Sequence, residues 1–234
     1  MRYLGRLLAY LAVFFITFSL GYTLLLRWVP VTLTPLKAIR LAEHLPEEGL
    51  RVRSNWVPLR KVAMPMVRAV IATEDNHFLS HRGFDWDAID RALDENREGK
   101  RLRGGSTISQ QTAKNVFCLP ARTWLRKGVE GWFTVLIETF WSKRRIMEVY
   151  LNVVETGRNM YGVEAPARDV YGKTAAELNA HEASMIGTVL PNPLRRDMAA
   201  PSGYMVRRAA QVRSLMGKLG PIEFDRPEGG KDKD

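Results

Sequence analysis

Residues 129–141 read VEGWFTVLIETFW, and this stretch decides the fold class. Its large apolar side chains stand at positions 129, 132, 133, 136, 137, 140 and 141, a spacing of i, i+3, i+4, i+7, i+8, i+11 and i+12. The spacing places them on one face of an α-helix, so it predicts a helix that packs on a core. Glu130, Thr134 and Glu138 follow the flank of the same helix. We expect this flank to be polar, with its carboxylates in salt bridges.

Further helical patterns lie on both sides of this stretch, and no comparable run of alternating apolar and polar residues occurs. Thr107 and Gln110 have the spacing of a capping box, and Thr174 and Glu177 repeat it. The sequence predicts a mainly α-helical domain with at most a short hairpin. Helices are expected over residues 66–74, 86–93, 107 to before Pro120, 129–141, 174 to Pro191 and 201–219.

The N-terminal segment predicts a membrane span. Residues 7–26 (LLAYLAVFFITFSLGYTLLL) contain no charge, and as a helix they would span roughly 30 Å, one hydrocarbon core. A cleaved signal peptide is the competing interpretation, but its apolar stretch is usually shorter and ends in a small-x-small site. The exit at residues 25–28 (LLRW) has no such site. An uncleaved anchor is therefore favoured.

The chain organisation follows from this anchor. Arg2 and Arg6 precede the span and Arg27 follows it, so local charge is nearly balanced, and long domains translocate largely regardless of charge. We expect the domain outside the cytoplasm. The predicted parts are a cytoplasmic stub (1–6), a transmembrane helix (7–26), a proline-interrupted connector and membrane-proximal segment (27–56), a main domain (57–220) and a flexible tail (221–234).

Composition limits the function classes. A chain of 234 residues holds one domain of good size, and 46% hydrophobic with 26% charged residues excludes wholesale disorder. The single Cys118 excludes an internal disulfide framework and multi-cysteine metal sites. The net charge of +10 indicates an anionic partner. A domain outside the cytoplasm leaves an anionic lipid surface or a phosphorylated substrate rather than nucleic acid.

Two carboxylates at the end of the 66–74 helix and two histidines just after it could take part in catalysis or metal binding. Glu74 lies on the apolar stripe and Asp75 follows it, so a carboxylate enters the core at the last helical turn. Burial would raise its pKa and make it a general base, whereas a frayed helix end would leave it solvated. His77 and His81 stand four apart and invite a metal hypothesis. Structural histidines bonded to loop backbone are the favoured interpretation.

A polar face and a cationic cluster follow. Thr107, Gln110, Gln111 and Lys114 share one helix face by their spacing, which suits sugar hydroxyls and a phosphate or an ordinary solvated side. Arg122, Arg126 and Lys127 follow closely. Together with Lys114 they would clamp a pyrophosphate or form solvated surface charge.

Four segments, in this order and spacing, resemble the signature motifs of the peptidoglycan glycosyltransferases. They are residues 74–83 (EDNHFLSHRG), 105–114 (GSTISQQTAK), 126–130 (RKGVE) and 143–152 (KRRIMEVYLN). The resemblance covers about Val57 to Pro193 and makes residues 57–220 a glycosyltransferase domain. No Ser-x-x-Lys occurs, so the transpeptidase half of bifunctional penicillin-binding proteins is absent.

The resemblance implies a lysozyme-like helical fold that polymerises lipid II into β-1,4-linked glycan by inverting transfer, with release of undecaprenyl pyrophosphate. Glu74 would be the general base on the acceptor 4-hydroxyl, and Glu130 the second catalytic glutamate, which would position cations or a divalent metal. The implied substrate-binding set divides by role. Lys114, Arg122, Arg126 and Lys127 would bind phosphates; Ser106, Thr107, Gln111 and Asn115 would line the site; Asp75, Phe78 and His81 would hold the Glu74 turn; residues 143–152 would be largely architectural.

The same resemblance sets the expected surroundings. The enzyme would lie in the cytoplasmic (inner) membrane as a single-pass protein, with its domain on the outer or periplasmic face. Its partners would be lipid II, the nascent glycan strand and the membrane, with cell-wall synthases or division proteins left open. The resemblance names no certain cofactor and leaves a divalent cation such as Mg²⁺ or Mn²⁺ open. Two other functions also stay open: a peptidoglycan-cleaving lysozyme-like enzyme and a catalytically silent membrane-anchored envelope scaffold.

Overall fold

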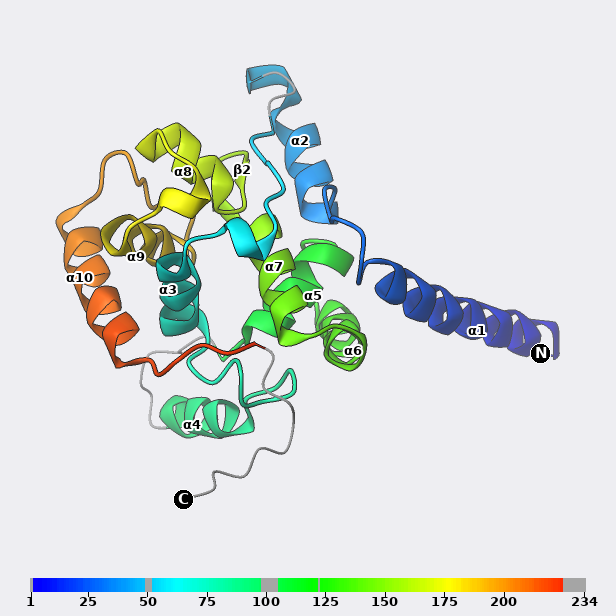
Figure 1. Cartoon of the computed structure of the whole chain (residues 1–234). Helices are drawn as coiled ribbons and strands as arrows, with labels where there is room; N and C mark the ends of the chain where they lie inside the picture. The colour runs from blue at the N-terminus through cyan, green and yellow to red at the C-terminus, as the bar shows by residue number, and fades with distance from the viewer. Residues whose placement is uncertain (1, 49–51, 98–104, 122, 225–234) are drawn as a thin grey trace.

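The computed structural model describes residues 2–48, 52–97, 105–121 and 123–224 (Figure 1). The structure is mainly helical with one N-terminal apolar helix, which confirms the predicted fold class. Its elements are α1 (Arg2–Leu25), α2 (Pro35–Glu48), η1 (Leu59–Lys61), α3 (Met64–Glu74), α4 (Trp86–Arg97), α5 (Ile108–Phe117), α6 (Trp124–Phe140), α7 (Lys143–Val153), β1 (Glu155–Gly157), β2 (Met160–Tyr161), α8 (Glu164–Tyr171), η2 (Ala175–Glu177), α9 (Ala180–Val189) and α10 (Gly203–Lys218).

Helix α6 carries the apolar stripe into the core, as predicted. Phe133, Leu136 and Ile137 are buried on it. The expected polar flank is wrong in one respect, because Glu130 and Thr134 are also buried, at 2% and 0% exposure. The reason is tertiary: α5 packs along α6 and covers this flank.

Helices α3, α9 and α10 form the other part of the core (Figure 1). The contact between α3 and α9 is close because α9 has a glycine there: a Cβ on Gly187 would lie 3.3 Å from Thr73 Cγ2. Arg68 of α3 joins α10 to this pair. Its guanidinium donates to the carbonyls of Met216, at 2.7 Å from Nη2, and of Leu219. These carbonyls lie at the C-terminal end of α10, where no N–H group of the helix donates to them. The guanidinium of Arg68 supplies the missing donors.

The predicted short hairpin is present as β1 and β2, which pair antiparallel with Glu155 opposite Tyr161. Gly162 follows it at φ +73°, and a Cβ there would lie 3.0 Å from the carbonyl oxygen of Leu151, so the turn requires glycine. Arg53 adds a parallel bridge to Met160. This bridge attaches the segment before η1 to the hairpin of the domain.

Two local expectations were wrong. The segment 27–56, expected to be an irregular connector, contains α2, because Thr34 caps its start and Pro35 occupies the first helical position, where proline is favoured. The capping box at Thr174 holds only the single 3₁₀ turn η2. A second capping box, between Asn179 and Glu182, opens α9. The tail from residue 225 onward lies outside the described residues.

Helix α1 is the one helix among the described residues that is long and apolar enough to cross a membrane. Most of its side chains are exposed, and it projects from the domain (Figure 1). Its last two turns are held by polar contacts. Trp132 donates to Ser19 Oγ at 3.1 Å, Trp141 donates to the Thr23 carbonyl at 2.8 Å, and Arg145 donates to the Leu26 carbonyl at 2.8 Å.

Candidate functional site

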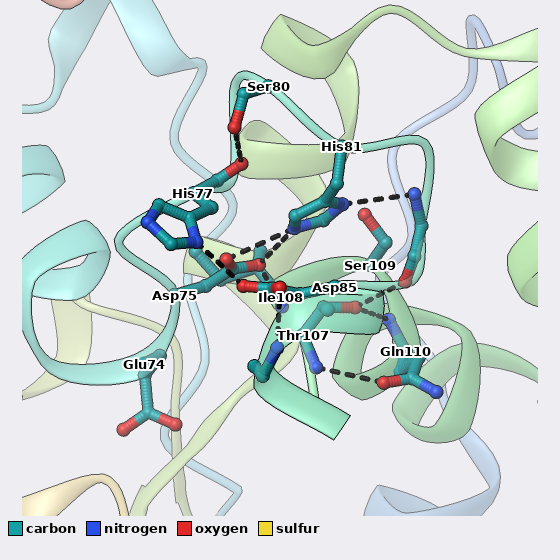
Figure 2. A network of polar contacts seen from close by, with 12 residues as sticks. Glu74, Asp75, His77, Ser80, His81, Asp85, Thr107, Ile108, Ser109 and Gln110 are labelled. Atoms are coloured by element: carbon teal, nitrogen blue, oxygen red, sulfur yellow. Dashed lines mark hydrogen bonds and ion pairs between the residues drawn. The ribbon is translucent and has the colours of Figure 1, made fainter. Parts of the chain in front are cut away.

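Glu74 is the last residue of α3, as the sequence predicts, and Asp75 is its C-cap. The stripe of Met66, Val70 and Ile71 is buried and fixes the helix in the core. The carboxylate of Glu74 is therefore delivered by a rigid element to the edge of the core. Figure 2 shows it beside the polar network of the following loop, with its oxygens pointing away from His81.

Asp75 locks this loop to the start of α5 (Figure 2). Its carboxylate accepts from the backbone N–H of Ile108 at 3.0 Å and from His81 Nε2 at 2.9 Å. Gly83 N–H donates to His81 Nδ1 at 3.1 Å, so the proton of the neutral ring is on Nε2 and points at Asp75. Both side chains are engaged within the protein, which fixes the turn that carries Glu74.

The predicted polar face of α5 is divided. Thr107 and Gln110 form the expected capping box and are buried at 3% and 5% exposure. The Thr107 hydroxyl also donates to the Gly83 carbonyl at 2.6 Å. Helix capping and the loop contact use the Thr107 hydroxyl and the Gln110 amide oxygen. Thr107 therefore stabilises the loop and the start of α5 instead of lining the site. Gln111 and Lys114 are less buried than Thr107 and lie on the side of α5 that faces the site.

Gln111 makes the contact that orients the candidate base. Its Nε2 donates to Glu74 Oε2 at 2.7 Å. The other oxygen, Glu74 Oε1, is buried and has no hydrogen-bond partner among the described residues. Tyr150 lies behind this pair, fully buried, and its hydroxyl is 3.4 Å from Gln111 Oε1. Because a carboxylate only accepts hydrogen bonds, the contact with Glu74 assigns the amide, with the NH₂ toward Glu74 and the oxygen toward Tyr150.

Burial raises the pKa of the Glu74 carboxyl above its ordinary value of 4.5. The hydrogen bond from Gln111 and the charge of Lys114 oppose this rise. Protein around the Lys114 ammonium lowers its pKa in turn, while the charge of Glu130 opposes that shift. Lys114 is thus close enough to both Glu74 and Glu130 to interact with each electrostatically.

Glu130 organises the cations of α6. Its buried carboxylate pairs with both Arg126 and Lys127, one on each oxygen. Arg126 lies one turn before Glu130 and Lys127 three residues before it, so the helix itself sets this geometry. Lys114 of α5 adds a third cation. Arg122, the fourth predicted member, lies outside the described residues.

Three further predicted residues take different positions. Phe78 is fully buried, with Lys143 Nζ 4.6 Å from its ring centre, so it packs in the core under the Glu74 turn. Ser106 is exposed and Asn115 is buried at 7% exposure. Lys143 pairs with Glu138 at 2.8 Å, which confirms the predicted salt bridge.

The segment 143–152, expected to be architectural, anchors backbone outside α7. Asn152 Oδ1 accepts from Val57 N–H at 2.7 Å and its Nδ2 donates to the Val57 carbonyl at 2.8 Å. Glu148 accepts from Leu59 N–H at 2.8 Å. These contacts hold the start of the domain against α7.

The described site residues do not form a metal centre. Among the described residues no three His, Cys, Asp or Glu side chains gather to hold a metal ion. His77 contacts Asp85 at 2.9 Å and His81 contacts Asp75, so the two histidines serve different loop contacts. The Glu130 carboxylate already faces two cations. A divalent ion at Glu130 therefore does not fit this donor set.

Arg196 is a cation that acts on Glu74 electrostatically and that the sequence did not predict. It lies after α9, donates to the Thr188 carbonyl and stacks over Tyr204, with 5.4 Å from its guanidinium carbon to the ring centre. Its positive charge also lowers the pKa of Glu74. Residues 190–193 (LPNP) precede it closely. No pattern in the sequence around Arg196 predicts that this segment lies near Glu74.

Comparison with known proteins places the chain. A family model described as transglycosylase matches residues 42–217. The chain belongs to the transglycosylase family. Among its relatives, each called biosynthetic peptidoglycan transglycosylase, one from Bdellovibrio bacteriovorus is 47% identical over 213 residues, covering 91% of this chain and 85% of the relative. One from Rhodospirillum centenum is 48% identical, covering 92% and 90%, and one from Pseudomonas fluorescens is 44% identical, covering 96% and 94%.

The family assignment confirms the resemblance drawn from the four motifs. The matched region includes all four and both glutamates, so the transglycosylase family and the site geometry concern the same part of the chain. Glu74, Gln111 and Lys114 come together from α3 and α5, and the Glu130 cluster adjoins them from α6.

Proposed function

We propose that this transglycosylase polymerises lipid II into β-1,4-linked glycan strands by inverting transfer, with Glu74 as the general base. The enzyme class agrees with the names of its relatives. The observation that carries the mechanism is the asymmetry of the Glu74 carboxylate. Gln111 holds one oxygen at 2.7 Å, and the other is buried without a partner among the described residues. A base needs such a free oxygen for the proton that it takes.

The proposed step balances as a single displacement. Glu74 Oε1 takes the proton of the acceptor 4-hydroxyl while that oxygen attacks C1 of the donor sugar. The bond between C1 and the pyrophosphate oxygen breaks, and undecaprenyl pyrophosphate leaves with the bonding electrons. The raised pKa of Glu74 brings its basicity nearer to neutral pH, where proton transfer is most effective.

The cations stabilise the leaving group. Lys114, Arg126 and Lys127 outnumber the two carboxylates near them, Glu130 and Glu74, so positive charge remains available for a pyrophosphate. Preformed charges of this kind act strongly where negative charge grows in the transition state. Glu130 holds Arg126 and Lys127 in place, which makes it a positioning residue in this proposal. Ser106 and Gln111 are the proposed contacts to sugar.

A divalent cation, if the reaction uses one, would come with the substrate. Mg²⁺ is often bound through phosphate oxygens and one or two carboxylates rather than by a protein cage. That arrangement agrees with the lack of a three-ligand cluster among the residues described. Chelation of divalent ions would test it, with the extent of polymerisation as the readout.

The membrane placement is also proposed. Helix α1 would cross the cytoplasmic membrane once, with the short N-terminal stub inside and the catalytic domain on the outer or periplasmic face. The length and apolar exposed surface of α1 support this placement. Its partners there would be lipid II, the growing glycan strand and the lipid surface, and cell-wall synthases or division proteins would be within reach.

Purified full chain incubated with labelled lipid II tests the proposal. Polymer that a β-1,4-specific muramidase degrades is the expected product, with Glu74→Gln inactive and Glu130→Gln impaired. Lipid II binding by Glu74→Gln controls for folding. Cleavage of preformed glycan would instead indicate a muramidase, and no reaction with either substrate would indicate a scaffold.

A further inference from the structure

Arg196 is a half-buried cation that the proposed mechanism does not use. Its guanidinium donates to the Thr188 carbonyl and lies over the Tyr204 ring, 5.4 Å from the ring centre. The neighbouring Asp197 accepts from the N–H of Ala199 instead, at 2.8 Å. No carboxylate among the described residues forms an ion pair with Arg196. Because an uncompensated charge away from water is unfavourable, this arrangement favours an anionic ligand.

Capping of α9 explains only part of this side chain. Thr188 belongs to the last turn of α9, where carbonyls lack donors within the helix, and an arginine near a helix C-terminus often supplies one. That contact uses one of the N–H groups of Arg196, and the stack on Tyr204 fixes the plane of the guanidinium. The remaining N–H groups have no partner in the part of the chain that the structure describes. An oriented guanidinium with free donors suits a phosphate, which it can bind through two parallel hydrogen bonds.

Arg196 lies beside Glu74, on the α9 side of the site. Gly187 of α9 packs against Thr73, the residue before Glu74, and the Thr188 that Arg196 contacts is next to Gly187 in the chain. The charge of Arg196 lowers the pKa of Glu74, so the two groups are within electrostatic reach. The cations assigned to the leaving group come from α5 and α6 instead. Figure 1 shows α3, which ends at Glu74, between α9 and α10 on one side and α5 and α6 on the other.

The two sides of Glu74 have different roles in the proposed step. In a single in-line displacement, the attacking oxygen and the leaving oxygen lie on opposite sides of C1. Glu74 takes its proton from the attacking oxygen, and the cations of α5 and α6 face the leaving pyrophosphate. A cation on the α9 side of Glu74 therefore faces the acceptor. When two molecules of lipid II react, only the donor loses its pyrophosphate, so the acceptor still carries one.

We infer that Arg196 binds the pyrophosphate that the acceptor lipid II keeps, with Tyr204 holding the guanidinium in place. The inference rests on the proposed function. The reacting complex contains two pyrophosphates at once, and the cations of α5 and α6 can hold only the one that leaves. Arg196 makes the enzyme selective, because a sugar chain without its pyrophosphate loses this contact as an acceptor.

Separate donor and acceptor substrates test this inference with the full chain. The donor is lipid II with its 4-hydroxyl blocked by galactose, so it cannot accept. The acceptor is a lipid II analogue with a methylene group in place of the oxygen between C1 and the pyrophosphate, so it keeps both phosphates and cannot donate. A second acceptor has an uncharged linker instead of the pyrophosphate. Measurements are made above the pH at which Glu74 is protonated, because loss of the Arg196 charge also raises the Glu74 pKa.

Arg196→Gln should raise the KM for the anionic acceptor by about tenfold or more, the usual effect of losing charge-assisted hydrogen bonds, and leave the KM for the donor unchanged. With the uncharged acceptor, Arg196→Gln and the unaltered enzyme should have the same KM. Arg196→Lys keeps the charge without the paired geometry, so its KM for the anionic acceptor should be intermediate. Arg195→Gln removes the same charge from the adjacent exposed position and is the matched control, with both KM values unchanged.

Three outcomes would overturn the inference. A higher KM for the donor would place Arg196 with the leaving group. An equal rise in KM for the anionic and uncharged acceptors would show that Arg196 does not recognise the phosphates, and an unchanged KM for the anionic acceptor would leave it a helix cap only. Partial unfolding of a variant lowers the rate through the active fraction without altering either KM. Failure of the proposed function is distinguishable, because the unaltered enzyme would then join no pair of substrates.

Discussion

Replacing Glu74 by glutamine should abolish polymerisation and stabilise the fold. The change keeps the shape of the side chain, and its remaining oxygen can still accept from Gln111 Nε2, now 2.7 Å from Oε2. It removes the basicity of the free position at Oε1. A general base typically contributes about 10²–10⁴-fold to rate, so kcat should fall by that factor, equivalent to roughly 3–5 kcal/mol of transition-state free energy.

The stability gain follows from the direction in which burial moves the pKa. The folded-state pKa of Glu74 lies above the ordinary 4.5 because burial disfavours its charge. Between 4.5 and that raised value the folded protein binds more protons than the unfolded chain, so stability falls as pH rises through this window. Glutamine has no charge to desolvate. The variant should therefore unfold at a higher temperature than the unaltered protein at neutral pH.

The assay is a pair of measurements on the same preparations. Product formation from labelled lipid II gives the loss in rate, and thermal unfolding between about pH 4 and pH 8 gives the stability difference. The glutamine variant should be more stable at neutral pH, and the difference should vanish at the acid end, where Glu74 is neutral. An active variant, or one less stable than wild type at neutral pH, would refute the assignment of a desolvated base.

Other expectations concern the groups around this carboxylate and the topology of the chain. Lys114→Ala should lower kcat/KM by about 10²-fold through loss of a charge-assisted contact. Tyr150→Phe releases the amide of Gln111, so the acid limb of the pH–rate profile should move to higher pH; Tyr161→Phe, which removes another buried hydroxyl, should not move it. A reporter fused after Asp234 should be active only outside the cytoplasm, and a soluble product lacking α1 would contradict the anchor.

Local signals in the sequence were sufficient where one short segment determines the outcome. The Thr107 and Gln110 capping box is formed within four residues, and Glu74 ends its helix where the apolar stripe ends. The stripe on α6 likewise predicts its own burial. In each case the interacting groups are near neighbours in the chain, so spacing alone fixes their geometry.

The parts that could not be predicted depend on which elements pack together. Gln111 reaches Glu74 across 37 positions and Tyr150 reaches Gln111 across 39, and no local pattern encodes either contact. The flank of α6 is polar in sequence, but α5 covers it and buries Glu130 with its two cations. Periodicity shows that a face is polar, and only the neighbouring helix decides whether that face meets water.

The hydrogen bonds between the domain and the end of α1 fix the orientation of this helix relative to the domain. Trp132, Trp141 and Arg145 bind its last two turns from α6 and α7. A spanning helix adapts to a bilayer of unsuitable thickness by tilting, because hydrophobic mismatch is costly. Because these three contacts hold the end of α1 to the domain, the tilt would carry Glu74 and the cationic cluster with it. Glycan synthesis in vesicles should therefore vary with lipid acyl-chain length, even though no catalytic side chain has changed.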